Sequence, residues 1–494
     1  MNIKHLYSLL ALVPLCATAD ITTDKIYADH MVLQRGQEIP ISGTCTGTDT
    51  LTVSFNGNTV TATVSDNRWT ATLPPMKANA KGQSITITQG NDKLVLQDVL
   101  VGEVWIASGQ SNMLWRLNQT GDTNSLRETA TPHFRFFHSE PQVHTNAAAY
   151  GQREKDILNK GEMYKGSWSA NTQQTRARMS AVGYYFGREL QKCLKVPVGV
   201  IHASLGGSEM MAWIPPAVLQ EKYPECTTKE WLDSKYMSAW VRGRARRNIG
   251  ADLNAPHPYK PAYLFETGIS PWLNFPVAGV IWYQGESDAE IQDMEQNYTL
   301  LSDLIAGWRS ALGNPKLPFL QVELPRINDR SKLRAYWPEF RTVQQRAAFK
   351  IPGVDALTTI DLGSKNSDVH PPRKLEVGTR LANLAAAKVY GKKIPYSGPV
   401  VAKVVPKGEK LRVYLGMAKK LKTTDGQPPA GFEISEDGQN FHPATAKIKG
   451  CSVELTAPQV NKPTYARYGW YTYMEPNLVN EHGLPTVPYA PEQP

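Results

Sequence analysis

A serine lies between a buried apolar run and the start of a helical pattern, in VLVGEVWIASGQSNMLWRL (99–117). The apolar run predicts a strand over residues 99–107, and Gly109 allows a tight turn ahead of Ser111. The hydroxyl would then lie at the carboxyl end of a strand and beside a helix N-terminus, where free N–H groups favour negative charge. This setting suits nucleophilic attack on a carbonyl, because attack creates an oxyanion that needs nearby donors. The alternative is that the serine only caps a helix.

A nucleophilic serine needs a base, and the segment DLGSKNSDVHPPRK (361–374) supplies a candidate. It follows a strand-like run at 354–360 and precedes a helical pattern at 375–390, so His370 also lies at the carboxyl end of a strand. Asp368, two residues earlier, can accept a hydrogen bond from the imidazole and orient it. A single loop histidine is more often a surface residue, but serine, aspartate and histidine in this order across a parallel sheet predict a catalytic set.

Two further segments repeat the pattern of a strand followed by a polar loop. They are SLGGS (204–208) and QGESD (284–288), each after an apolar run. Glycine N–H groups can approach a ligand closely, and a glutamine amide can donate a hydrogen bond. The N–H groups of Ser111 and Gly207 and the side chain of Gln284 therefore predict an oxyanion hole. The alternative is a set of ordinary loop glycines with polar residues that cap helices.

Taken together, these blocks resemble the sialate O-acetylesterase family within the SGNH, or GDSL-type, serine hydrolases. The resemblance rests on GQSNM, SLGGS followed by AWIP, WYQGESD and DVHP in this order. It extends from ADHMVLQRGQEIPISG to NEHGLP, roughly residues 21–488. It implies hydrolysis of O-acetyl esters on sugars, with Ser111 as the nucleophile, His370 as the base, Asp368 as its partner and Gly207 as the glycine of the second block.

The chain departs from the wider superfamily in two blocks. Gln284 stands where that superfamily has an asparagine, as is usual in this branch. The acid and base are spaced Asp-x-His rather than Asp-x-x-His, which leaves Asp361 or a backbone carbonyl as alternatives to Asp368 for orienting His370.

Two assignments have a rival residue in the sequence. Gly206 is an alternative to Gly207 as the glycine donor. Ser287 also lies in a Gly-x-Ser setting, but it lacks the turn into a helix that precedes Ser111.

The formal net charge of +9 raises the question of an anionic partner. The densest basic run, VRGRARR (241–247), is short and lacks interleaved aromatic residues, so we expect no nucleic acid and interpret the run as a solvated face. An alternative is that one of its arginines, or Arg116 close to the nucleophile, binds a substrate carboxylate of the kind that sialic acids carry.

The apolar pattern divides the chain after its N-terminal leader into three parts. Residues 20–98 alternate apolar and polar positions, with an Asn56-Gly57 hairpin signal, and predict an N-terminal β-sandwich-like domain. Residues 99–395 alternate strands and helices and predict an α/β domain with a parallel sheet covered on both faces. The resemblance implies the SGNH-type, flavodoxin-like form of that fold, in three layers. Residues 396–494 predict a C-terminal β-sandwich-like domain.

Within the central part the expected strands are 99–107, 198–203, 277–283, 319–323 and 354–360, and the expected helices are 180–194, 298–312, 338–349 and 375–390. The pattern weakens at about 215–276, where prolines and aromatic residues are dense. We interpret this stretch as a partly helical insertion beside the active site.

The first 19 residues predict a secretory signal peptide, cleaved after Ala19. A lipoprotein site at Cys16 is a weaker alternative, because Leu15 precedes it rather than a small residue. No later apolar run is long enough to span a membrane. We therefore expect a periplasmic or extracellular protein of a bacterium.

The remaining cysteines are Cys45, Cys193, Cys226 and Cys451, which are scattered and lack metal-ligand spacing. We expect mostly buried thiols, with one disulfide as an alternative. The chain also lacks HExxH, a Walker loop and GxGxxG. We therefore expect no catalytic metal and no organic cofactor.

These observations give three functional hypotheses. The first is a sialate O-acetylesterase acting through a serine acyl-enzyme, with O-acetylated sialic acid or another acetylated glycan as substrate. The second is an acetylesterase of xylan or another plant polysaccharide, which would share the catalytic blocks. The third is a non-catalytic carbohydrate-binding protein, which has no need for Ser111, Asp368 and His370 at one end of a sheet.

Overall fold

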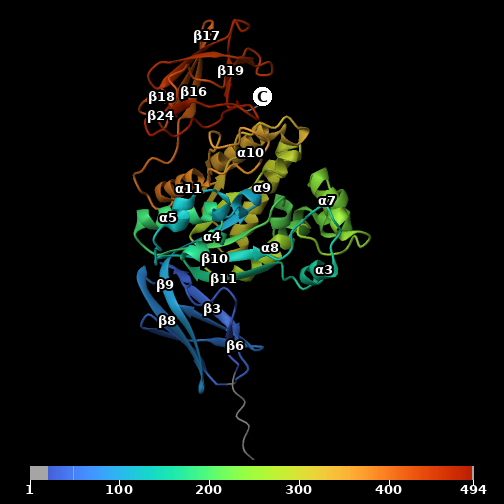
Figure 1. The fold of residues 1–494 in the computed structure, drawn as a ribbon, viewed down its shortest axis with the longest axis vertical. Helices are drawn as coiled ribbons and strands as arrows, with labels where there is room; N and C mark the ends of the chain where they lie inside the picture. The colour runs from blue at the N-terminus through green and yellow to red at the C-terminus, as the bar shows by residue number, and fades with distance from the viewer. Residues whose placement is uncertain (1–19, 48, 492–494) are drawn as a thin grey trace, which may run out of the picture.

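The computed structural model describes residues 20–47 and 49–491 of the 494-residue chain. The predicted signal peptide, residues 1–19, lies outside the described residues. An N-terminal β region, a central α/β region and a C-terminal β region follow one another along the longest axis (Figure 1).

The central sheet has the strand order β11-β10-β12-β9-β13-β14-β15. Neighbours from β10 to β15 are parallel, and β11 at the edge pairs antiparallel with β10. The bounds are β9 Asp92–Gly109, β10 Phe134–Pro141, β11 Tyr164–Ala170, β12 Val198–Ser204, β13 Gly279–Tyr283, β14 Phe319–Val322 and β15 Val354–Leu357. All five expected strands are present, whereas β10 and β11 were not predicted.

Strand β9 is the point at which the strand order reverses. Its neighbours β12 and β13 both follow it in the chain but lie on opposite sides of it. Gly109 is in register with Ser204 on one side and with Tyr283 on the other. The loops after these three strands therefore meet at one edge of the sheet, where open α/β sheets bind their ligands.

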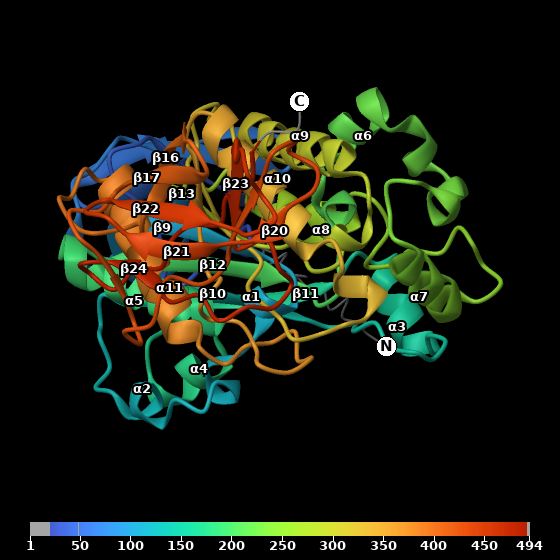
Figure 2. The ribbon, with the colours of Figure 1, turned by 90° about the horizontal axis from the view of Figure 1, so that it is seen from above.

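Helices cover both faces of this sheet (Figures 1 and 2). On one face α5 (Ala181–Leu194) and α11 (Lys374–Lys388) pack against residues such as Trp105 and Val200. On the other, α8 (Tyr263–Gly268), α9 (Met294–Ala311) and α10 (Trp337–Lys350) pack against residues such as Trp282 and Phe319. The four expected helices correspond to α5, α9, α10 and α11, with ends that differ by up to four residues.

The other helices are short and lie in the connections. They are α1 Ser111–Leu114, α2 Thr123–Arg127, α3 Gln152–Asn159, α4 Gln173–Arg178, α6 Pro216–Lys222 and α7 Ala239–Ile249. Helices α6, α7 and α8 lie within the expected insertion, which is partly helical as predicted. The basic run VRGRARR lies on α7.

The N-terminal region consists of two sheets that share a core containing Ile41, Val53 and Trp69. Its strands are β1 Thr22–Thr23, β2 Val32–Gln34, β3 Ile39–Thr44, β4 Leu51–Phe55, β5 Asn58–Thr61, β6 Thr63–Ser65, β7 Arg68–Leu73 and β8 Asn79–Gln89. The hairpin between β4 and β5 turns at Asn56 and Gly57, both with positive φ, as predicted. Strands β2 and β8 pair with β9, which continues from this region into the central sheet. The boundary expected after residue 98 therefore falls inside a continuous strand.

The C-terminal region contains three further sheets. Its strands are β16 Val400–Lys407, β17 Lys410–Gly416, β18 Leu421–Thr423, β19 Phe432–Ser435, β20 His442–Pro443, β21 Thr445–Ile448, β22 Ser452–Thr456, β23 Tyr465–Tyr468 and β24 Leu478–Asn480. The buried Arg341 of α10 donates hydrogen bonds to Gly469 O at 2.7 Å and Tyr471 O at 3.0 Å. This arginine attaches the region to the helices of the central sheet.

All four cysteines among the described residues are free thiols. Cys45 and Cys226 are buried as expected, whereas Cys193 is half-buried and Cys451 is exposed. No helix in the described part of the chain is long and apolar enough to cross a membrane.

Candidate active site

The turn after β9 places Ser111 at the first position of α1. Gly109 has a φ of 132°, and a Cβ at this position would clash with the backbone carbonyl of Tyr283 on the neighbouring strand. Only glycine fits this close approach. Ser111 is half-buried, and its hydroxyl makes no hydrogen bond within residues 20–47 and 49–491.

His370 lies in the loop between β15 and α11, as the sequence predicts. Its Nδ1 is 3.4 Å from Asp368 Oδ1, and its backbone N–H donates to the same oxygen at 2.9 Å. Trp115 stacks on the imidazole, with 4.8 Å between ring centroids and 18° between the planes. The alternative carboxylate, Asp361, is held instead by two hydrogen bonds from Arg380, of 2.8 and 2.6 Å. Of the two carboxylates, the structure places Asp368 beside the imidazole.

One buried asparagine connects the loops that carry these residues. Asn112, directly after the serine, has no exposed surface. Its amide donates a hydrogen bond to Val369 O at 2.9 Å, one residue before the histidine, and another to the carboxylate of Glu286. Its carbonyl accepts a hydrogen bond from the ammonium group of Lys374. A single side chain therefore joins the serine turn, the histidine loop and the QGESD loop.

Lys374 is fully buried at the first position of α11. Burial lowers the pKa of Lys374 to about 7, and the carboxylate of Glu286 opposes this shift. Burial also raises the pKa of Glu286, against the hydrogen bond from Asn112 and the charge of Lys374. We did not predict Asn112 or Lys374 from the sequence. The sequence does indicate that Lys374 is unusual, because it lies at the start of a helix, where the helix dipole disfavours a positive charge.

The same surroundings affect the histidine. Burial lowers the pKa of His370, and the nearby charge of Lys374 lowers it further, while Asp368 raises it. The imidazole is therefore neutral near pH 7 and can accept a proton.

The glycine pair of the second block lies next to the serine. A Cβ on Gly206 would be 3.5 Å from the Cβ of Ser111. Gly207 has a φ of 73°, and a Cβ there would clash with the hydroxyl of Tyr259. That hydroxyl donates to Gly206 O at 2.9 Å, so a residue of the helical insertion supports this loop.

Gln284 follows β13 and is buried. Its amide donates to Ser208 O at 2.7 Å and to Asp288 Oδ2 at 2.6 Å, and its carbonyl oxygen has no partner within the described residues. The reverse orientation of the amide would place its oxygen against two acceptors. Donation to an oxyanion therefore requires the amide to release one of these two acceptors.

The rival nucleophile and the expected substrate arginine both have partners within the protein. The hydroxyl of the buried Ser287 donates to Gly207 O at 3.4 Å and accepts from Gln110 Nε2 at 3.5 Å. Arg116 forms an ion pair with Glu140 on β10, with an N···O distance of 2.6 Å. A substrate carboxylate at Arg116 would have to compete with Glu140.

The basic run on α7 is only partly solvated. Arg247 is exposed and Arg246 forms an ion pair with Asp233 at 2.6 Å. Arg244 is half-buried and lies over the Trp240 ring, 5.2 Å from its centroid. The described residues contain no group of three or more His, Cys, Asp or Glu side chains that could hold a metal ion.

Known proteins resemble this chain at the level of sequence. A family model for carbohydrate esterases described as sialic acid-specific acetylesterases matches residues 266–387, which include Gln284 and His370 but not Ser111. The sialate O-acetylesterase of Mus musculus is 27% identical over 421 residues, covering 76% of this chain and 75% of that protein. The Homo sapiens enzyme is 27% identical over 417 residues, covering 76% of this chain and 72% of its own length.

A solved structure extends the similarity to nearly the whole chain. The crystal structure of a carbohydrate acetylesterase from Xanthomonas citri is 30% identical and has a TM-score of 0.78. The match covers 96% of this chain and 100% of that one. The chain therefore belongs to the carbohydrate acetylesterases, is similar to the sialate O-acetylesterases among them, and is a carboxylic ester hydrolase.

Proposed function

We propose that this protein removes O-acetyl groups from sugars through a covalent acetyl-enzyme on Ser111, with O-acetylated sialic acid as its preferred substrate. Membership of the family supports the ester chemistry, and the names of the curated relatives support the sialate. One observation carries the serine mechanism. Asn112 ties the turn that presents Ser111 to the backbone beside His370, so the nucleophile and base candidates are held on connected loops.

In the proposed reaction, neutral His370 takes the proton of the Ser111 hydroxyl as its oxygen attacks the acetyl carbonyl. The N–H groups of Ser111 and Gly207 stabilise the oxyanion, with the amide of Gln284 as a third donor once it has released an acceptor. His370 then gives its proton to the sugar oxygen as the ester bond breaks. Water, activated by the same histidine, attacks the acetyl-enzyme, and acetate leaves as the serine hydroxyl re-forms. Asp368 orients the imidazole throughout.

A second candidate substrate is an acetylated neutral polysaccharide such as xylan. The Xanthomonas citri relative, which has the higher identity, is described only as a carbohydrate acetylesterase. The ion pair between Arg116 and Glu140 also occupies the arginine that we expected to bind a sialate carboxylate. The hypothesis of a purely carbohydrate-binding protein is not retained, because the family is one of esterases.

We also propose the SGNH-type three-layer arrangement for residues 99–395 and bracing roles for the flanking β regions. The hydrogen bonds from Arg341 to the C-terminal region support bracing. Secretion to the periplasm or exterior, through cleavage after Ala19, rests on the N-terminal sequence pattern.

A serine-directed fluorophosphonate probe tests the proposed mechanism. We expect the wild-type protein and a Ser287→Ala control to be labelled at Ser111, as mapped by peptide mass spectrometry, and Ser111→Ala to remain unlabelled. Labelling at Ser287, or equal labelling of Ser111→Ala and the wild type, would rule out Ser111 as the nucleophile.

A further inference from the structure

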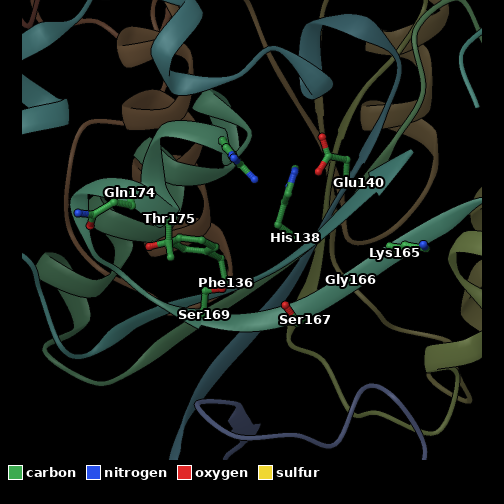
Figure 3. A pocket seen from close by; sticks show the side chains of 10 residues that line it. Phe136, His138, Glu140, Lys165, Gly166, Ser167, Ser169, Gln174 and Thr175 are labelled. Atoms are coloured by element: carbon green, nitrogen blue, oxygen red, sulfur yellow. The ribbon is translucent and has the colours of Figure 1, made fainter. Parts of the chain in front are cut away.

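A cavity lies on the same sheet, away from Ser111. It has a volume of about 520 Å³, within the range of roughly 300–1,000 Å³ typical of small-molecule sites. Strands β10 and β11 form its floor and helix α4 one wall, and the side chains of His138 and Glu140 rise from the floor into the same space (Figure 3). The pairs His138↔Ser167 and Glu140↔Lys165 lie directly across from each other on the two strands.

The cavity carries an excess of positive charge. Its lining includes Lys165, Arg178 and Glu140, and Glu140 is already paired with Arg116. Within the described residues, neither Lys165 nor Arg178 forms an ion pair, and both are exposed. Two cations therefore remain available for a ligand, and a carboxylate suits the planar guanidinium of Arg178.

The floor offers a hydrogen-bonding group that the protein leaves unused. The Nδ1 atoms of His138 and His202 are 3.3 Å apart in stacked rings, and His202 Nε2 is 2.7 Å from Ser204 Oγ. His138 Nε2 is buried and has no partner within the described part of the chain. Burial lowers the pKa of His138 to about 4, so its ring is neutral near pH 7. In either tautomer, Nε2 offers one free donor or acceptor position.

The remaining lining groups suit a sugar. Ser167, Ser169 and Gln174 supply hydroxyl and amide groups that can bind sugar hydroxyls, whereas the hydroxyl of Thr175 already donates to Ala170 O at 2.7 Å. A small inorganic anion would leave these groups and most of the volume unused. The combination of free cations and neutral polar groups fits a carboxylate-bearing sugar residue.

The position of the cavity relates it to the nucleophile. Strand β10 lies two strands from β9, so the cavity is roughly 10 Å to one side of the serine turn. Arg116, five residues after Ser111, reaches the rim through its ion pair with Glu140. This separation suits a neighbouring sugar residue of one glycan better than the acetyl group itself.

We propose that this β10–β11–α4 cavity binds a carboxylate-bearing sugar residue of the glycan, beside the residue whose acetyl ester reaches Ser111. The acid can be a sialic acid or a uronic acid, which present the same carboxylate and hydroxyl chemistry. The proposal rests on the proposed function, because it assigns the cavity to the same substrate.

Titration calorimetry with unacetylated oligosaccharides tests the proposal. The acidic probes are sialyllactose and a xylotriose substituted with glucuronic acid, and the neutral probes are lactose and xylotriose. We expect at least one acidic probe to bind about tenfold more tightly than its neutral counterpart. We also expect Arg178→Gln or Lys165→Gln to weaken acidic binding about tenfold, because each removes a charged partner. The acidic probe that binds identifies the source of the carboxylate.

Lys192→Gln is the matched control, because it removes one exposed positive charge in the last turn of α5, outside the residues that line the cavity. It should leave binding of the acidic probes unchanged. Equal binding of acidic and neutral probes, or full acidic binding by Arg178→Gln, would overturn the proposal. Since the probes carry no ester, these results do not depend on hydrolysis. Turnover of p-nitrophenyl acetate by the wild type tests the proposed function separately.

Discussion

Replacing Asn112 with alanine should slow ester hydrolysis about 100-fold. The side chain makes three buried hydrogen bonds, to Val369 O, to the Glu286 carboxylate and to the Lys374 ammonium. The first of these fixes the backbone beside His370 relative to the residue after Ser111. A displacement of about 1 Å between reacting groups can cost about 100-fold in rate, and Asn112→Ala frees the loop to make such a shift.

The same substitution should lower the free energy of unfolding by about 4 kcal/mol. Two of the lost bonds involve charged groups, each contributing roughly 1.5–3 kcal/mol, and the third is a neutral bond of about 1 kcal/mol. The sum is about 4–7 kcal/mol, and the expected loss lies at its lower end because Glu286 can take up a proton once its donor is gone. Calorimetric unfolding of the variant and the wild type measures this difference.

Asn480→Ala is the matched control. Asn480 is also an almost fully buried asparagine, and its amide donates to two backbone carbonyls in the C-terminal region. This variant should unfold at a lower temperature but keep the wild-type kcat for p-nitrophenyl acetate. If folded Asn112→Ala also keeps a kcat within twofold of the wild type, the proposed link between the two loops is wrong.

Two further predictions concern the base and the oxyanion. Because burial and Lys374 lower the pKa of His370, kcat/KM should fall as pH drops through a midpoint below 6.5, its ordinary value. Lys374→Met removes a positive charge that lowers the pKa of His370, so the midpoint should move to higher pH. Asp368→Asn removes a negative charge that raises this pKa, so the midpoint should move to lower pH. Equal midpoints in the pH–rate profiles of the variants and the wild type would contradict both assignments. Gln284→Ala should reduce kcat about 100- to 1,000-fold with little change in KM, as for other single oxyanion donors, and an unchanged kcat in steady-state assays would remove Gln284 from the hole.

The sequence predicted the elements that carry the site because strands buried on both faces appear as continuous apolar runs. Strands β9, β12 and β13 have this pattern, and the polar loops after them stand out. Strand β11 was missed for the opposite reason. As an edge strand it is largely exposed, and its sequence YKGSWSA contains only one buried residue, Trp168.

The boundary expected after residue 98 was placed at a change in the apolar pattern. The alternating pattern becomes a continuous apolar run there because β9 passes from a sheet with one covered face into a sheet with two. The backbone continues as one strand, so a change in burial resembled a change of domain.

The contacts among Asn112, Glu286 and Lys374 lay beyond sequence reasoning. Asn112 and Lys374 are 262 positions apart, and only the packing of α11 against the sheet brings them together. The orientation of the Gln284 amide depends likewise on Asp288 and the Ser208 carbonyl.

Acetate release from matched O-acetylated sialic acids and acetylated xylo-oligosaccharides tests the central claim most directly, with wild type and Ser111→Ala assayed in parallel. The account predicts that the wild type releases acetate, with the sialic acids preferred, and that Ser111→Ala loses nearly all turnover. A preference for the xylo-oligosaccharides would keep the serine mechanism and replace the substrate. Equal acetate release by Ser111→Ala and the wild type would contradict the account.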